Sequence, residues 1–168
     1  MDNLSSIGKI IRNATIKDLK AVAELEALCF PPKEAASEEI FLQRLENFSE
    51  CFWLLEKHGN IISMVNGILT DERDLSDEMY ESSDMHKSNG SRLMIFGVET
   101  KPEYRRKGYA DELLRYVIKE QRRSGRQGIV LTCKENLVRF YEKFGFQNEG
   151  VSKSTHGDVV WYQMRLDF

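Results

Sequence analysis

Cysteines are few in this sequence, and none are spaced as a pair. Cys29, Cys51 and Cys133 form no C-x-x-C motif, and their odd number leaves one without a partner. Such usage is typical of reduced thiols in a cytosol and argues against a disulfide-rich secreted scaffold. We therefore expect a cytoplasmic protein, and the sequence predicts no metal site.

Long apolar runs and a basic excess are also missing. No apolar segment reaches the length of a membrane span, and the N-terminus lacks the apolar stretch of a signal peptide. The formal net charge is −3, whereas a nucleic-acid-binding protein normally carries an excess of Lys and Arg. We expect neither a membrane nor a nucleic acid as a partner, and either a monomer or a homodimer.

The composition is that of an ordinary globular protein, with 41% apolar and 30% charged residues. A chain of 168 residues can bury a substantial core and still form one domain. The sequence contains no repeats, low-complexity tracts or linkers between domains. We expect a single domain over residues 1–168.

Apolar periodicity predicts elements in the order β-α-α-β-β-β-α-β-α-β-β, which favours an α/β domain with a mixed sheet. The acidic segment 70–90 is expected to be a functional or mobile loop. Its carboxylates are expected either to attract a cationic amine or to form a solvated face. The expected strands cover 9–13, 52–56, 61–69, 129–133, 146–154 and 159–168, with a central strand from Leu93; the expected helices run from Thr15 to before Pro31, over 37–48, from Gly108, and over 135–144.

Residues 93–110 carry the strongest functional signal. A buried strand and a proline-containing turn lead into three basic residues, after which Gly108 and Ala110 open a helix. The first N–H groups of a helix have no intrahelical partner and lie at the positive end of its dipole. This combination predicts a site for a phosphate or pyrophosphate. The alternative is a solvated basic surface in which Gly108 only serves the turn.

The pattern Arg105-x-x-Gly108-x-Ala110 resembles the Q/R-x-x-G-x-G/A signature of the GNAT superfamily of N-acetyltransferases, where it holds the pyrophosphate of acetyl-CoA. Residues 139–146, R-F-Y-E-K-F-G-F, resemble the F-Y-E-K/R-x-G-F segment of the same superfamily. The order of elements also coincides with that family. The resemblance implies a mixed, mostly antiparallel sheet of about seven strands flanked by about four helices.

The resemblance extends to the arylalkylamine (serotonin-type) branch. Residues 132–146 are similar, without gaps, to M-C-E-D-A-L-V-P-F-Y-E-R-F-G-F, and residues 67–75 resemble G-S-L-W-D-E-E-R-L. In the vertebrate enzymes two histidines of the central strand help to deprotonate the amine, but the matching residues here are Met94 and Phe96. Lys134 stands where the wider superfamily has an asparagine, which the branch also lacks.

Acetyl transfer needs a base and an acid. An alkylamine with a pKa near ~10 must lose a proton before it attacks a thioester, and the departing thiolate must gain one. The resemblance gives the acid role to Tyr141, for which a core tyrosine is the alternative. For the base we favour Glu34 in the linker between the first two helices, against a solvent-exposed glutamate as the alternative. Weaker candidates for the base are Glu24, Asp71 and His86.

The central strand is expected to bind the pantetheine arm. Alternation would place Met94, Phe96, Val98 and Thr100 on one face. The resemblance implies that backbone groups of Val98 and Thr100 bind pantetheine amides, and that one N–H group polarises the acetyl carbonyl. The expected cofactor-binding residues are Val98, Glu99, Thr100, Arg105, Arg106, Lys107, Gly108, Tyr109, Ala110 and Tyr141; the expected acceptor-binding residues are Phe30 and Thr132, with Phe41, Phe52 and Trp53 either in that pocket or in the core.

The function implied by this resemblance is acetyl-CoA-dependent N-acetylation of a primary amine of a small molecule, either arylalkylamine-like or polyamine-like. We expect direct transfer in a ternary complex, because Cys133 on a buried strand is better explained as a core residue than as a nucleophile. Two alternatives remain open. One is a non-catalytic acyl-CoA-binding sensor, and the other is a protein N-terminal or lysine acetyltransferase.

Overall fold

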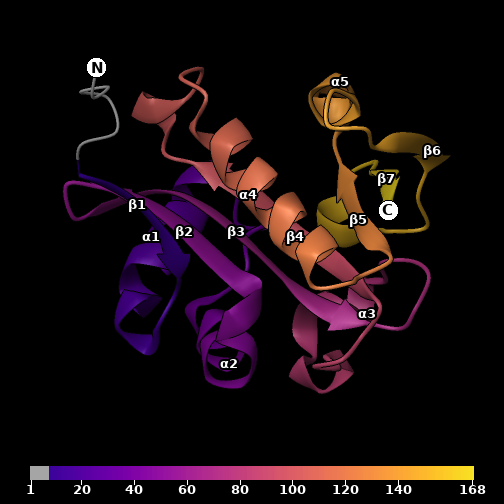
Figure 1. Cartoon of the computed structure of the whole chain (residues 1–168), viewed down its shortest axis with the longest axis horizontal. Helices are drawn as coiled ribbons and strands as arrows, with labels where there is room; N and C mark the ends of the chain where they lie inside the picture. The colour runs from indigo at the N-terminus through magenta and orange to yellow at the C-terminus, as the bar shows by residue number, and fades with distance from the viewer. Residues whose placement is uncertain (1–7) are drawn as a thin grey trace.

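The computed structural model describes residues 8–168, and in this range seven strands form one sheet in the order β1-β2-β3-β4-β5-β7-β6 (Figure 1). Only β4 and β5 pair in parallel, so the predicted mixed, mostly antiparallel sheet is confirmed. The strands are β1 (Lys9–Asn13), β2 (Phe52–Lys57), β3 (Asn60–Thr70), β4 (Arg92–Thr100), β5 (Gly128–Cys133), β6 (Gln147–Val151) and β7 (Tyr162–Asp167). The helices are α1 (Leu19–Cys29), α2 (Glu38–Phe48), α3 (Asp77–Glu81), α4 (Tyr109–Arg123) and α5 (Val138–Glu142).

Helices cover both faces of the sheet, and β2 shows why its sequence is continuously apolar. Phe52 and Leu54 pack with side chains of α1 and α2, whereas Trp53 and Leu55 belong to the cluster that contains the apolar stripe of α4. Successive side chains of a strand point to opposite faces, so a strand covered on both sides is apolar throughout. Phe41, Phe52 and Trp53 are therefore core residues and do not line the acceptor pocket.

Two helix starts follow the capping signals in the sequence. Asp18 Oδ2 accepts the Thr15 N–H at 2.8 Å, and a short 3-10 turn then leads into α1. Ser37 Oγ accepts the Ile40 N–H at 3.2 Å and so caps α2. No helix of residues 8–168 combines the length and the apolar character needed to cross a bilayer.

The helix expected over residues 135–144 is shorter than predicted. A 3-10 turn covers Glu135–Leu137, and α5 begins only at Val138. The turn changes the register of the helix, so Val138 is buried while Leu137 is 41% exposed. On α1, the apolar residue Leu28 is 58% exposed because it lies beyond the edge of the buried stripe.

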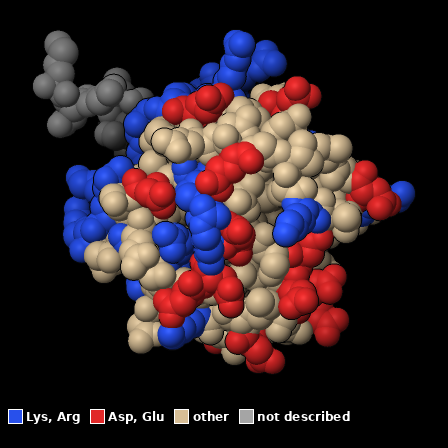
Figure 2. Space-filling view, turned by 90° about the vertical axis from the view of Figure 1, so that its right-hand side faces the viewer, with Lys and Arg blue, Asp and Glu red and all other residues tan. Residues whose placement is uncertain are grey.

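The acidic segment is ordered by its own carboxylates. Asp71 Oδ1 accepts the Ser91 N–H at 2.9 Å, and its other oxygen is paired with Lys87. Asp74 is paired with Arg165 of β7. Figure 2 shows acidic side chains beside basic ones at the centre of the end of the molecule that carries β6 and β7, and a group of acidic side chains with few basic neighbours at its lower right. Asp71 and Asp74 of this segment therefore stabilise the fold.

Candidate active site

The two parallel strands separate and open a cavity. β4 and β5 pair from Arg92 and Gly128 to Ile95 and Leu131, and no pairing continues beyond this point. A cavity of about 1070 Å³ lies there, bounded by the α1–α2 linker, the start of α4, α5 and the β6–β7 loop. Of the predicted site residues, Lys107 is outside the cavity lining, with its Nζ 5.8 Å from the Tyr104 ring. The cavity is lined by the others: Phe30, Glu34, Val98, Glu99, Thr100, Arg105, Arg106, Gly108, Tyr109, Ala110, Thr132 and Tyr141.

The turn before α4 has the geometry of an anion site. Arg106 and Gly108 both have left-handed backbone conformations, with φ of 61° and 85°. Left-handed residues within a turn direct neighbouring N–H groups into one concave surface. The first bond of α4 joins Glu112 N–H to Gly108 O at 3.0 Å, so the N–H groups before it are left for a ligand. No heavy atom lies within 4 Å of the position that a Gly108 Cβ would take.

A β-bulge changes which residues of β4 face the cavity. Asn66 pairs with Gly97 and Gly67 with Ile95, which leaves Phe96 as an extra residue. The side-chain alternation expected along β4 fails here, because Phe96 and Glu99 both approach Arg44 of α2. Arg44 Cζ lies 4.4 Å from the centre of the Phe96 ring, and Arg44 interacts electrostatically with Glu99.

Met94, which like Phe96 stands where the vertebrate enzymes have a histidine, is fully buried and does not line the cavity.

At the far end of β4, the Thr100 carbonyl already accepts hydrogen bonds from Arg105 Nε at 3.2 Å and from Cys29 Sγ at 3.4 Å. Lys101 N–H donates to Ile62 O on β3, so strand alternation turns the Thr100 N–H toward the cavity. The N–H is therefore the Thr100 backbone group that faces the cavity.

Tyr141 lies on α5 beside the separated strands. It is 5% exposed, and its ring packs edge-on against Phe140 and Phe146. Its hydroxyl has no hydrogen-bond partner among residues 8–168. Burial raises the pKa of Tyr141, and its electrostatic interactions with Cys133 and Glu99 raise it further. The phenol is thus held protonated, within electrostatic range of Glu99.

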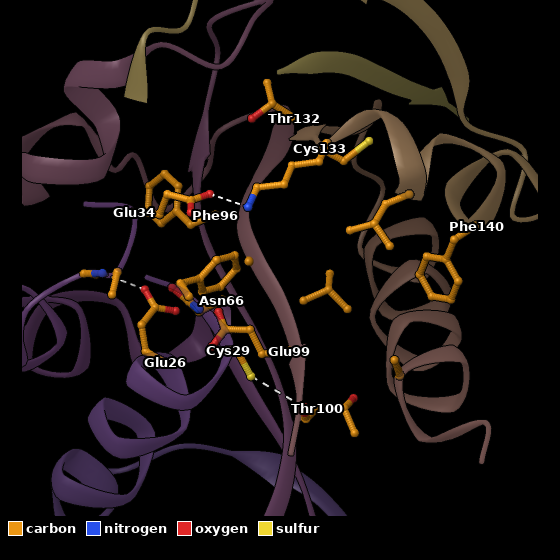
Figure 3. Close-up of a pocket in the computed structure, with 18 of the residues that line it drawn as sticks. Glu26, Cys29, Glu34, Asn66, Phe96, Glu99, Thr100, Thr132, Cys133 and Phe140 are labelled. Atoms are coloured by element: carbon orange, nitrogen blue, oxygen red, sulfur yellow. Dashed lines mark hydrogen bonds and ion pairs between the residues drawn. The ribbon is translucent and has the colours of Figure 1, made fainter. Parts of the chain in front are cut away.

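Glu34 is buried at 7% exposure and is not the solvent-exposed residue of the alternative interpretation. Lys134 Nζ lies 2.7 Å from Glu34 Oε1, and a dashed line at Glu34 in Figure 3 marks this ion pair. His156 Nε2–H donates to the Glu34 carbonyl at 2.8 Å. A Cβ on Gly157 would lie 2.6 Å from Glu34 Cγ, so the linker and the β6–β7 loop are in direct contact.

Tyr80 and the β6–β7 loop complete a roof over the acceptor side. The Tyr80 ring stacks on His156 with centroids 5.0 Å apart, and its hydroxyl lies 3.3 Å from Thr132 Oγ1. Asp77 holds the loop in place, because its carboxylate accepts Ser154 Oγ–H at 2.5 Å and the Thr155 N–H at 3.0 Å. This loop-holding role for Asp77 was not apparent in the sequence.

The order of strands, the separated pair and the turn before α4 agree with the family whose model matches residues 19–146, described as the acetyltransferase (GNAT) family. The chain belongs to the GNAT acetyltransferase family. The loading GNATL domain of CurA from Lyngbya majuscula shares the fold with a TM-score of 0.82 and 18% identity, over 95% of this chain and 97% of that one. The paiA N-acetyltransferase from Thermoplasma acidophilum, in complex with coenzyme A, has a TM-score of 0.70 and 17% identity, over 96% and 100%.

Among curated proteins, the chain is similar to serotonin N-acetyltransferase from Mesocricetus auratus. The two are 28% identical over 110 residues, which is 65% of this chain and 52% of that protein. The matched region therefore spans about half the length of this relative.

Two buried charged residues of this GNAT chain were not predicted as site residues from the sequence. Arg44 of α2 donates to Asn66 Oδ1 at 2.8 Å and to Tyr80 O at 3.0 Å, and burial lowers its pKa to about 10. Glu26 of α1 accepts the Ala36 N–H at 2.7 Å. Both occupy positions within apolar helix stripes, and a charge at such a position was the only signal available.

The weaker candidates for the base lie elsewhere. Glu24 is exposed on α1, and Asp71 anchors the acidic segment. His86 stacks on Phe48, accepts the Leu69 N–H at 3.2 Å through Nδ1, and bonds Glu50 at 3.1 Å through Nε2. None of the three lines the cavity.

Proposed function

We propose that this GNAT chain is an acetyl-CoA-dependent N-acetyltransferase that acetylates a primary amine of a small molecule, arylalkylamine-like or polyamine-like, in a ternary complex. The observation that carries the proposal is a single cavity that joins the anion-binding turn to Tyr141 and to three buried carboxylates. The coenzyme A in the paiA structure and the similarity to serotonin N-acetyltransferase support it.

The chain offers a place for each part of acetyl-CoA. N–H groups at the start of α4, with Arg105 and Arg106, would bind the pyrophosphate. The open side of β4 would pair with pantetheine, and the Val98 N–H would polarise the acetyl carbonyl. Tyr141 would protonate the departing thiolate. Lys107, outside the cavity lining, would contribute only to the local positive field.

The roof favours a small acceptor over a polypeptide. The His156–Glu34 hydrogen bond joins the β6–β7 loop to the α1–α2 linker, and Asp77 fixes that loop from the other side. A peptide chain would have to separate these contacts, whereas a small amine fits beneath them. The roof therefore favours small-molecule acetylation over protein acetylation.

Steady-state release of CoA tests the proposal against its alternatives. We expect turnover with at least one arylalkylamine or polyamine, and none with peptides that carry a free N-terminus or lysine. Acetyl-CoA binding without turnover on any acceptor would support the sensor function instead. Turnover confined to peptides would support protein acetylation.

Asp77→Asn tests whether the roof positions the acceptor. Asparagine can still accept the Thr155 N–H and donate to Ser154 Oγ, but it removes the negative charge that strengthens both hydrogen bonds, at a cost of about 1 kcal/mol. We expect the KM of the amine to rise roughly 3- to 10-fold, with acetyl-CoA affinity and kcat little changed. Kinetics of Asp84→Asn, an exposed carboxylate of the same segment, serve as the control. Equal amine KM values in the two variants would contradict this role.

A further inference from the structure

Glu99 lies in the cavity lining with an unpaired carboxyl group. It is 3% exposed, and neither of its side-chain oxygens accepts a hydrogen bond from an N–H or O–H group of the described residues. A buried carboxylate without partners is strongly disfavoured, so such a group takes up a proton or faces a ligand.

The nearest acidic group is Glu26. Figure 3 shows the two carboxyl groups turned toward each other from α1 and β4, with Asn66 beside them. They are close enough for a hydrogen bond when one of them is protonated. Gly97 makes this arrangement possible, because a Cβ at Gly97 would collide with Glu99 Oε1.

Charged and titratable groups reach Glu99 from each helix that packs around it. α1 supplies Glu26 and Cys29, α2 supplies Arg44, and α5 supplies Tyr141. Arg44 offsets one negative charge, but its two donated hydrogen bonds go to Asn66 and Tyr80 rather than to either carboxylate. Arg44, Glu26 and Glu99 together therefore have no net charge when the two glutamates share one proton. They carry one negative charge when both glutamates are ionised.

We propose, on the basis of the acetyl transfer argued above, that Glu26 and Glu99 together form the proton acceptor of the reaction. The fully ionised pair binds the ammonium group of the acceptor and takes one proton into the hydrogen bond between the two glutamates. The substrate class is thus an amine that arrives as a cation.

An ammonium proton passes to a carboxylate oxygen, and the freed nitrogen lone pair forms the C–N bond at the thioester carbonyl carbon, whose π electrons move to oxygen. When the oxyanion collapses, the C–S bond breaks and sulfur takes the Tyr141 proton, while the phenolate takes the second proton from nitrogen. The glutamate pair then releases its proton to solvent.

The electrostatics favour this pair over Glu34. Burial raises the pKa of Glu99 well above its usual range, and the neighbouring Glu26 charge raises it further, which makes a stronger base. Glu34 is instead held in an ion pair with Lys134, so its carboxylate is already engaged by a cation before an acceptor amine arrives. The Glu99 charge also reaches Tyr141, the proposed acid.

The pH profile of kcat/KM for an accepted amine tests the pair. Activity requires ionised glutamates, so the parent rate should fall as pH drops through the upper apparent pKa of the pair. Glu99→Gln should lower the high-pH rate by about 100-fold, and Glu26→Gln should move the acidic limb to lower pH because it removes the like charge. Glu24→Gln, an exposed site on the same helix, should change neither.

Infrared spectroscopy tests the glutamate pair without requiring turnover, so its result does not depend on whether the protein acetylates an amine. Infrared spectra of the protein with ¹³C-labelled glutamate should contain a protonated-carboxyl band at neutral pH that disappears in Glu99→Gln. Its absence from the parent protein would overturn the pair, whether or not any amine is acetylated. An unchanged pH profile in Glu99→Gln, or a shift seen in Glu34→Gln instead, would equally overturn it.

Discussion

Gly108→Asp is expected to weaken acetyl-CoA binding by at least about 100-fold, or about 2.7 kcal/mol, while the protein stays folded. Gly108 precedes the first turn of α4 and has a φ of 85°. No heavy atom within 4 Å would hinder a new side chain, so the fold loses only the preference of glycine for this conformation. The added carboxylate would lie where the pyrophosphate binds, and like charges repel strongly at such short range. Calorimetric titration with acetyl-CoA measures the change.

The same helix provides a matched control. Gly125 follows α4, has a φ of 78°, and also has no heavy atom within 4 Å of its Cβ position. Gly125→Asp therefore carries a similar backbone cost but places the charge at the opposite helix end. We expect parent-like acetyl-CoA affinity in Gly125→Asp and similar melting temperatures in both variants. Unchanged affinity in Gly108→Asp would exclude the turn as the pyrophosphate site.

The features predicted well from sequence are those that neighbouring residues determine. The turn before α4 depends on a glycine, a helix start and adjacent basic residues, all within 105–110. The sheet and its buried strands follow from apolar patterns of the same local kind. The motif around Tyr141 predicts a site residue, and Tyr141 lies in the cavity lining.

The features missed depend on contacts between distant elements. Glu26 and Glu99 come together only because α1 packs against β4, and the bulge at Phe96 cancels the alternation on which the prediction relied. Gly67 and Gly97 flank that bulge and were the local cue to it. The Glu34–Lys134 pair joins residues 100 positions apart, so no sequence pattern could reveal that the carboxylate was already neutralised.

Tyr141→Phe is expected to lower kcat by roughly 10- to 1000-fold with little change in acetyl-CoA affinity. The phenylalanine ring keeps the edge-on contacts with Phe140 and Phe146. The lost hydroxyl leaves no buried donor or acceptor unsatisfied, because no described residue hydrogen-bonds to it. The raised pKa keeps the phenol protonated throughout the assay range, so a proton is always available for the thiolate. Single-turnover and steady-state kinetics measure the loss.

The raised pKa also makes Tyr141 a weak acid, and this gives the prediction a second part. Proton transfer from a weak acid to a thiolate is unfavourable when the corresponding thiol has a pKa of about 8.5. It becomes favourable if the phenolate regains a proton from the attacking nitrogen. A better leaving thiolate needs less help, so a thioester of a more acidic thiol should lose less rate in Tyr141→Phe than acetyl-CoA does. Tyr116→Phe, on the exposed side of α4, should behave like the parent with both thioesters. A rate loss that is the same for both thioesters would show that Tyr141 acts through packing and not through its proton.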